Sequence, residues 1–458
     1  MSDGIHNRAA PAWIIAAASF GFAVVQLDVT VVNVALPQVG ASLAAGTAAL
    51  QWVVDGYTLS FAALLLSAGV LADRIGARRA YLLGFALFTL ASIACGLAPD
   101  ARQLVAARVA QGAGAALLVP ASLAVLNHAF GNDAARRARA VGVWTAAGGV
   151  SIAAGPIVGA ALLVALGWRS IFLVNLPVCA LGAALSARHL PAARGAAPAR
   201  GFDPLGQLLA IAALAGLTIA IIAAPSWPQA PAAVLAGAAL ALLGASLFVV
   251  AEARTPSPML PLSFFRKRTF SVAMMFGLLF NLAYYGVMFV LSLYLQRAHG
   301  YSALRAGSAY LPLTATFIFS NLASAPLAIR YGAAVPMSAG ATLAALGFAL
   351  LTRLSADSSY ARMLPAFALI PCGMGIAVPA MTATMLASVE RRWGGTASGA
   401  LNAARQAGGA IGVALFGALA AGGSTAIVHG LRAAAGLSVA LLLAAALIAG
   451  LWLRGART

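Results

Sequence analysis

Residues 69–79 read Gly-Val-Leu-Ala-Asp-Arg-Ile-Gly-Ala-Arg-Arg and separate two apolar stretches, at 50–72 and 79–98. Each stretch has the roughly 20 residues that a helix needs to cross a hydrocarbon core of about 30 Å. A helix also satisfies its own backbone hydrogen bonds, which lipid cannot do. The two stretches are therefore predicted to be membrane-spanning helices, and the charged segment between them a short loop.

The composition of the whole chain extends this interpretation. Of the 458 residues, 62% are hydrophobic and 8% are charged, whereas soluble domains carry about 25% charged residues. The formal net charge of +18 is spread over short loops, so it does not indicate binding to nucleic acid. The connections between apolar stretches are too short to hold a soluble domain. We therefore expect an all-α integral membrane protein.

The number of spans and their orientation follow from the apolar stretches and the basic residues. The stretches lie near residues 12–36, 50–72, 79–98, 103–128, 138–165, 169–188, 204–224, 230–251, 269–296, 303–328, 333–352, 361–387, 395–421 and 431–453. With the N-terminus in the cytoplasm, 19 basic residues fall in cytoplasmic connections and termini, and seven fall in outer connections. Cytoplasmic loops carry the excess of Lys and Arg. This asymmetry predicts fourteen spans with both termini in the cytoplasm.

The chain also contains an internal repeat. Val70–Gly76 aligns with Pro326–Gly332 at an offset of 256 residues, and Val119–Ala121 aligns with Val378–Ala380 at nearly the same offset. Matches in the same order and at near-constant spacing indicate two related halves. Parallel repeats of this kind are a transporter architecture, with the substrate site between the halves.

Several segments resemble motifs of the major facilitator superfamily. Residues 69–79 resemble its signature loop, Arg108–Gly114 its second motif, and Gly155-Pro156-Ile-Val-Gly159 the antiporter motif of its exporters. Other segments are similar to those of its fourteen-span drug:proton antiporters: Leu27–Pro37, Gln51–Tyr57, Gly167–Pro177 and Arg405–Gly409.

The resemblance implies a fold of two pseudo-symmetric six-helix bundles with two inserted helices. On this basis the N-terminal bundle is residues 1–190, the linker with the two inserted helices is 191–268, and the C-terminal bundle is 269–458. It also implies a multi-pass protein of the bacterial cytoplasmic (inner) membrane.

The loop at 69–79 is interpreted as a conformational latch. Glycines at its ends permit close helix approach and tight turns, and an acid can pair with arginines or cap a helix. The alternative is a loop that only orients the chain through its positive charge. The second half has Ile329 in place of the acid, so a second latch there should be weaker. The candidate latch residues are Gly69, Asp73, Arg74, Gly76 and Arg78.

The antiporter-like segment of Gly155, Pro156 and Gly159 has no titratable group, so it cannot move a proton itself. Proline removes a backbone donor, and glycine lets helices approach closely. The segment therefore predicts a bend and a close contact between spans.

Charged residues inside the spans are the sharpest sign of a functional site, because they are costly in a membrane and usually functional. Asp28, Asp55 and Arg108 are expected at one level in the outer half of the N-terminal bundle. A carboxylate there can bind a proton in one conformation and release it in another. The alternative is a static ion pair that only orients the helices.

Arg405 lies near the middle of its span, beside Asn402. It is a candidate to gate a cavity or to bind a polar or anionic group, and structural pairing with backbone carbonyls is the alternative. The other candidate cavity residues are Asn33, Trp52, Tyr57, Asn281, Tyr284 and Tyr285.

Proton-coupled efflux of small lipophilic drugs, antibiotics or metabolites is the leading hypothesis. A proton-coupled importer or symporter is the alternative within the fold, and a non-transporting sensor is the alternative from another class. We expect neither an enzyme nor a metal site, because the chain has no nucleophile motif, phosphate loop or metal-ligand spacing. We expect no cofactor, since the proton gradient would drive transport. The expected partners are a small-molecule substrate, protons and the lipid bilayer, for a monomer that acts alone or with a periplasmic adaptor.

Overall fold

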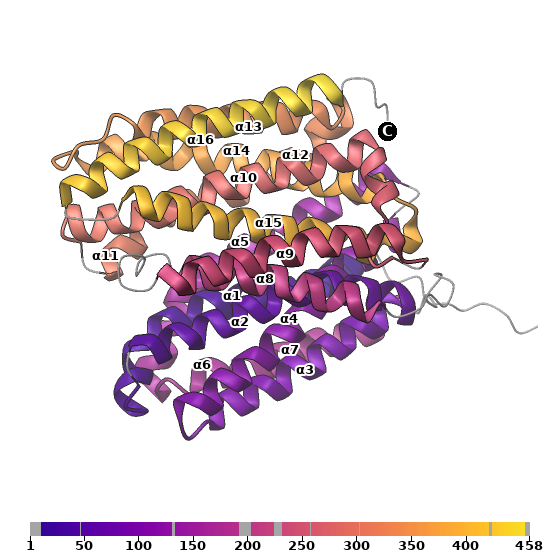
Figure 1. Ribbon diagram of the computed structural model, residues 1–458, viewed down its shortest axis with the longest axis horizontal. Coiled ribbons are helices and arrows are strands. Elements are labelled where there is room, and N and C mark those ends of the chain that lie inside the picture. The colour runs from indigo at the N-terminus through magenta and orange to yellow at the C-terminus, as the bar shows by residue number, and fades with distance from the viewer. Residues whose placement is uncertain are drawn as a thin grey trace, which may run out of the picture.

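The computed structural model describes residues 11–45, 47–130, 133–191, 203–223, 231–256, 258–301, 303–420 and 424–453. The side chains of Asn33 and Pro156 lie outside the described part, as do both termini and the linker at 192–202. The described residues form helices and no strand (Figure 1). The long helices are α1 (Pro11–Ser42), α2 (Thr47–Ile75), α3 (Ala77–Leu97), α4 (Ala101–Phe130), α5 (Ala134–Leu166), α7 (Asn175–His189), α8 (Pro204–Ala223), α9 (Pro231–Arg254), α10 (Arg268–Leu293), α12 (Leu311–Tyr331), α13 (Ala334–Leu351), α14 (Tyr360–Ala387), α15 (Gly394–Leu419) and α16 (Ser424–Trp452).

Short helices complete the chain. The α-helix α6 (Ser170–Leu173) leads into α7, and α11 (Ala303–Ser308) precedes α12. The 3-10 helices η2 (Leu262–Arg266) and η4 (Arg391–Trp393) precede α10 and α15, and the π-helix η3 (Tyr294–Ala298) follows α10.

The predicted all-helical membrane class is confirmed. Within the described residues, eleven helices are long and apolar enough to cross a bilayer, and α5 makes twelve if its two arms form one span. Those arms, Ala134–Ile152 and Ile157–Leu166, meet at 44°. The apolar part of α8 is shorter, at Pro204–Ala220. Helix α15 falls outside this set and carries polar residues along its middle.

The long helices form two groups, which Figure 1 shows as a violet half and an orange-to-yellow half. In the N-terminal group (α1 to α7), α4 packs against α2 and α3, and α1 packs against α5 and α7. In the C-terminal group (α10 to α16), α10 packs against α15 and α16, and α14 packs against α12 and α13. The groups meet along two seams, α2 with α15 and α5 with α12. The inserted pair, α8 and α9, lies over the first seam, where α8 contacts both α2 and α15.

Glycines set how closely these helices approach. A Cβ atom added at Gly112 in α4 would overlap the carbonyl oxygen of Tyr57 in α2 and would lie 3.0 Å from the Cβ of Ser60. In the C-terminal group, Gly408 and Gly412 of α15 lie equally close to the backbone of α10. Small residues let backbones touch in membranes, where association relies on van der Waals packing. Each group is therefore built around backbone-to-backbone contacts that a larger side chain would separate.

We expect Gly112→Val to destabilise the N-terminal group. The new side chain must push α4 away from α2, and overpacking of this kind costs about 1–3 kcal/mol. The control is Gly436→Val in α16, where an added Cβ would meet no atom within 4 Å. Thermal unfolding of the detergent-solubilised variants should show a lower Tm for Gly112→Val than for Gly436→Val. Equal Tm values would contradict the proposed role of this contact.

Candidate functional site

A buried ion pair joins α1 and α4. Arg108 Nη1 lies 2.5 Å from Asp28 Oδ2, and each residue is 1% exposed. Gln111 Nε2 and Asn175 Nδ2 each donate to Asp28 Oδ1 at 2.9 Å. Arg108 Nε donates to the carbonyl oxygen of Val53 in α2 at 3.0 Å. Four helices, α1, α2, α4 and α7, thus meet at this pair.

Further hydrogen bonds close the cluster, which we call the Asp28 network (Asp28, Ser92, Arg108, Gln111 and Asn175). Arg108 Nη1 donates to Gln111 Oε1 at 2.7 Å, and Gln111 Nε2 donates to Ser92 Oγ at 2.9 Å. Buried charges persist in a protein when they are paired and hydrogen-bonded. Here both charges have a partner, and the surrounding amides and hydroxyl satisfy the remaining sites.

The pairing of Asp28 with Arg108 brings together two residues that the sequence singled out. Asp55 lies elsewhere on α2 with a half-buried side chain, and within the described residues no hydrogen bond or ion pair joins it to the network. Sequence reasoning did not select Ser92, Gln111 or Asn175 as site residues. The signal that could have found them is a polar side chain inside an apolar stretch, and Gln111 and Asn175 lie within the motif segments Arg108–Gly114 and Gly167–Pro177.

The glycines of α5 hold α1 in place beside this network. A Cβ atom on Gly155 would overlap Thr30 Oγ1, and one on Gly159 would lie 3.2 Å from the carbonyl oxygen of Val31. The 44° bend of α5 falls between Ile152 and Ile157, in the segment that contains Gly155. The bend and the absent side chains let α1 approach α5 within two residues of Asp28.

A central cavity of about 80 Å³ lies between the two groups. Phe22, Gln26, Val29, Tyr57, Thr58, Phe61 and Val119 line it from the N-terminal group, and Tyr285, Asn402, Arg405 and Gln406 line it from the C-terminal group. Tyr57 links the cavity to the Asp28 network, because its ring also lies 4.2 Å from the guanidinium carbon of Arg108.

Four of the predicted cavity residues, Tyr57, Tyr285, Asn402 and Arg405, line this cavity. The cavity also has two glutamines, Gln26 and Gln406, that were not among the predicted site residues.

The remaining candidates lie outside the cavity. Tyr284 packs edge-on against Tyr285, with ring centroids 5.3 Å apart. Asn281 is buried and donates to the carbonyl oxygen of Gly277 at 2.7 Å. Trp52 is 45% exposed near the beginning of α2. These side chains lie on sides of their helices that do not face the cavity. The sequence pattern does not fix which side of a helix faces the cavity.

Arg405 is the cationic residue of the central cavity. Its Nε atom is buried and has no hydrogen-bond partner in the described part of the chain. The described residues that line the cavity include no acid. The cavity therefore presents an uncompensated positive charge and a free donor, beside the amides of Asn402 and Gln406.

A second cluster joins the two groups at the end of α2. Asp73 is 5% exposed, and its carboxylate accepts hydrogen bonds from the backbone N–H of Gly395, the backbone N–H of Thr396 and Thr396 Oγ1, each at 2.7 Å. These donors form the N-terminus of α15, where unpaired N–H groups and the helix dipole favour a negative charge. We call this the Asp73–α15 contact.

Of the other predicted latch residues, Gly69 lies at the Asp73–α15 contact and Arg74 lines a cavity beside it, whereas Gly76 and Arg78 make their contacts within the N-terminal group. A Cβ atom on Gly69 would overlap the carbonyl oxygen of Gly395, so the two helices touch at this point. Gly76 adopts a φ of 94°, which a side chain would strain, in the turn between α2 and α3. Arg78 donates to the carbonyl oxygen of Ala187 in α7.

The corresponding positions of the other seam are built differently. Ile329 in α12 is 48% exposed, and α5 is capped by its own Asp133, which accepts from Arg136 N at 2.9 Å. By contrast, α15 has no side-chain cap of its own. The N-terminus of α15 is thus completed by an acid from the other group, whereas the N-terminus of α5 is complete in itself.

The comparisons with known proteins agree with this architecture. The sequence profile of the Major Facilitator Superfamily matches residues 18–413. The chain is 39% identical over 391 residues to the methylenomycin A resistance protein of Streptomyces coelicolor, which covers 85% of this chain and 81% of that protein. It is 38% identical over 389 residues to the multidrug resistance protein Stp of Mycobacterium tuberculosis, which covers 84% of this chain and 72% of Stp.

A solved structure shares the fold. The crystal structure of the human organic anion transporter MFSD10 (TETRAN) superimposes with a TM-score of 0.71 and 17% sequence identity, covering 96% of this chain and 99% of that one. The likeness to this structure is one of fold, and the sequence profile and the relatives show that the chain belongs to the major facilitator superfamily.

Proposed function

We propose that this protein exports small lipophilic compounds, antibiotics among them, across the bacterial cytoplasmic membrane in exchange for protons. The observation that carries the proposal is the Asp28 network. It holds a carboxylate and its partner Arg108 beside Tyr57, which lines the central cavity between the two helix groups. The names of the relatives, a methylenomycin A resistance protein and a multidrug resistance protein, support export as the direction of transport.

The proposed topology has fourteen membrane-spanning helices and cytoplasmic termini. Helices α8 and α15 add to the twelve apolar spans, since they have 20 and 26 residues and pack alongside spanning helices. In this orientation the Asp73–α15 contact lies at the cytoplasmic side. Both seams also close toward this side. Gly399 lies against the carbonyl oxygen of Leu65 in the first seam, and Gly142 lies against that of Asn321 in the second. The described conformation is thus closed to the cytoplasm.

The proposed coupling step is protonation of Asp28. The charged carboxylate accepts hydrogen bonds from Arg108, Gln111 and Asn175. A protonated carboxyl would place its own hydrogen against one of these donors and leave Arg108 without a counter-charge. Protonation therefore disrupts the network and frees Arg108 and Tyr57 to move, and Tyr57 lines the central cavity. Proton binding and substrate binding can oppose each other through this ring, which is the requirement for antiport.

The proposed substrate site is the central cavity. Its aromatic and aliphatic lining suits an apolar body, and Arg405, Asn402 and the two glutamines supply polar contacts. Ligand sites commonly combine a mostly apolar lining with a few convergent polar groups. The cavity of about 80 Å³ is smaller than a drug, so the groups must separate before a whole substrate fits.

Asp28→Asn should abolish export driven by a pH gradient in inverted vesicles, because the amide keeps the size of the side chain but cannot release a proton. The matched control is Asp55→Asn, which should keep pH-driven export. Asp28→Asn leaves Arg108 without its counter-charge, and breaking a buried pair in this way costs about 3–5 kcal/mol. The double variant Asp28→Asn/Arg108→Gln removes both charges and separates folding from coupling. If the double variant regains pH-driven export, the pair is structural and the proton site lies elsewhere.

Asp73→Asn should shift the protein toward the conformation that is open to the cytoplasm. The negative charge at the N-terminus of α15 is lost, and such charges contribute about 0.3–2 kcal/mol, up to roughly a thirtyfold change in the equilibrium. Spin-label distances between α3 and α12 at the Asp73 end should lengthen, and substrate turnover should fall. Asp100→Asn, at an exposed acid that accepts from Gln103 N, is the control and should change neither. Unchanged distances in Asp73→Asn would show that the loop at residues 69–79 only orients the chain in the membrane.

Arg405→Gln should weaken export of anionic compounds by about tenfold or more, because hydrogen bonds to a charged group contribute about 1.5–3 kcal/mol. Arg405→Lys keeps the charge and should retain most of this activity. Neutral compounds should be affected little by either change. The measurement is a susceptibility panel in an efflux-deficient host, beginning with methylenomycin A and including neutral and anionic antibiotics. Equal losses for all compounds would assign Arg405 a structural role.

A further inference from the structure

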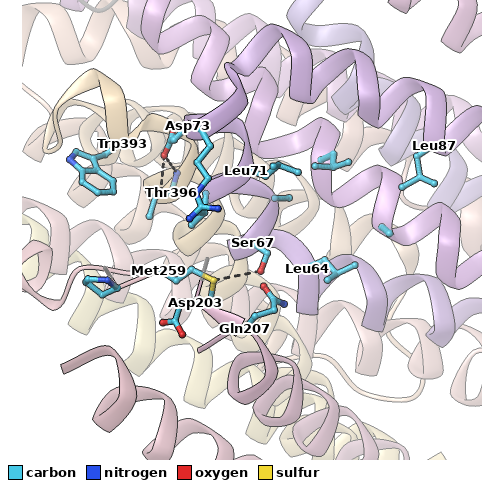
Figure 2. Close-up of a pocket in the computed structure, with 16 residues that line it drawn as sticks. Leu64, Ser67, Leu71, Asp73, Leu87, Asp203, Gln207, Met259, Trp393 and Thr396 are labelled. Carbon is cyan, nitrogen blue, oxygen red and sulfur yellow. Dashed lines mark hydrogen bonds between the residues drawn. The ribbon is translucent and has the colours of Figure 1, made fainter. Parts of the chain in front are cut away.

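A second cavity, of about 240 Å³, lies beside the Asp73–α15 contact (Figure 2). It shares no lining residue with the central cavity. Its walls come from α2, α3 and α4, from the beginning of α8, from the segment that follows α9, and from η4 and the beginning of α15. We call it the insert cavity.

The insert cavity is mostly apolar along α2 and α4, and it has polar groups where α8 begins and at the end of α2, where Asp73 and Arg74 line it. Leu64, Leu87 and Leu117 line the apolar part. Figure 2 shows Asp203 and Gln207 together on the α8 side, across from the α2 side chains. Asp203 caps α8, since its Oδ1 accepts from Gly206 N at 2.8 Å. The cavity is therefore amphipathic, with an apolar body and hydrogen-bonding groups beside α8 and beside the Asp73–α15 contact.

Gln207, and Asp203 through its Oδ2, line the cavity with polar atoms that have no partner in the described part of the chain. Of these two residues, Gln207 is the one whose side chain makes no hydrogen bond at all there. Its side chain is 8% exposed, and in the described part of the chain neither its Oε1 nor its Nε2 has a hydrogen-bond partner. Buried polar side chains almost always have a partner, and leaving a donor or acceptor unpaired is costly. An amide that lines a cavity and lacks both partners can be satisfied by a molecule in that cavity that accepts one hydrogen bond and donates another.

We propose that the insert cavity binds an amphipathic molecule from the membrane. Its apolar chain or ring system lies along α2 and α4, and its head donates to Gln207 Oε1 and accepts from Gln207 Nε2. The volume is below the roughly 300–1,000 Å³ of pockets that enclose whole drug-sized ligands, so it takes one chain or ring system with its head. Two sources share this chemistry, a membrane lipid and an exported compound.

An occupant of the insert cavity also acts on the seam between the two groups. Leu64 and Leu71 belong to the N-terminal group, whereas Trp393 and Thr396 belong to the C-terminal part of the chain. Asp73 and Thr396, which form the Asp73–α15 contact, are themselves part of these walls, so we infer that the cavity changes shape when this contact breaks. A ligand that binds one conformation better than another shifts the population toward it. The occupant therefore stabilises the conformation with the Asp73–α15 contact and slows turnover when it is in excess.

The test uses fluorescence of Trp393, which lines the insert cavity. The probe is 9,10-dibromostearamide, whose bromine atoms quench nearby tryptophan and whose amide head can pair with Gln207. The purified full chain is titrated beside Trp393→Phe, and the difference isolates quenching of Trp393. We expect saturable quenching, a roughly tenfold higher Kd in Gln207→Leu, and no change in Gln406→Leu, which alters the central cavity. A bromoalkane without the amide should bind the full chain and Gln207→Leu equally.

A second variant guards against misfolding of Gln207→Leu. Ala113→Leu fills the apolar part of the insert cavity from α4. This variant should not bind the probe, although its Gln207 is unchanged. Quenching of Trp393 in bilayers of brominated phospholipid, reduced in Gln207→Leu, identifies the occupant as a lipid. Displacement of the amide probe by an exported antibiotic, and not by phospholipid, identifies it as the exported compound. The proposal is overturned if Trp393 shows no saturable quenching, or if neither variant changes it. Neither outcome depends on proton-coupled export.

Discussion

Two opposite charges buried at the centre of one helix group impose the strongest constraint on this molecule. Neither Asp28 nor Arg108 can remain in an apolar interior without the other, so α1 and α4 must meet at this level. The need to satisfy the remaining donor and acceptor sites brings in α7 through Asn175 and α2 through the carbonyl oxygen of Val53. The glycines of α5 complete the arrangement, because they let α5 pack directly against α1 next to the pair.

The two charged clusters have different structural roles. The Asp28 network lies within one group, whereas the Asp73–α15 contact crosses between groups. Tyr57 connects the first cluster to the central cavity, and the insert cavity adjoins the second. In the proposed function, a change of charge at Asp28 acts first on the wall of the central cavity, and a change at Asp73 acts on how the groups separate. In the proposed cycle the first change selects what is bound and the second controls when the cytoplasmic side opens.

The sequence predicted the membrane class and singled out Asp28 and Arg108, together with Asp55, because charges inside apolar stretches are rare and costly. It did not identify Gln111 and Asn175, whose neutral side chains raise no comparable cost until they are buried. The partner of Asp73 could not be found from side chains, since two of its three donors are backbone N–H groups of Gly395 and Thr396. Asn281 and Trp52 were predicted to line the cavity but lie outside it. Spacing along a helix does not fix which side of the helix faces a neighbour, so the sequence could not exclude them. The polar residues of α15 that line the cavity, such as Arg405, lower the hydropathy of this helix. For that reason α15 does not have the apolar composition of the other spans.

Proton-for-substrate exchange is the central claim, and it can be measured in sealed proteoliposomes that contain a pH-sensitive dye and no initial pH gradient. The vesicles are loaded with methylenomycin A, or with another compound to which the protein confers resistance, and are diluted into medium that lacks it. Antiport predicts that the interior acidifies as the compound leaves, and that a protonophore abolishes the pH change while the compound still flows out. Efflux with no change in internal pH, or with alkalinisation of the interior, would contradict the account.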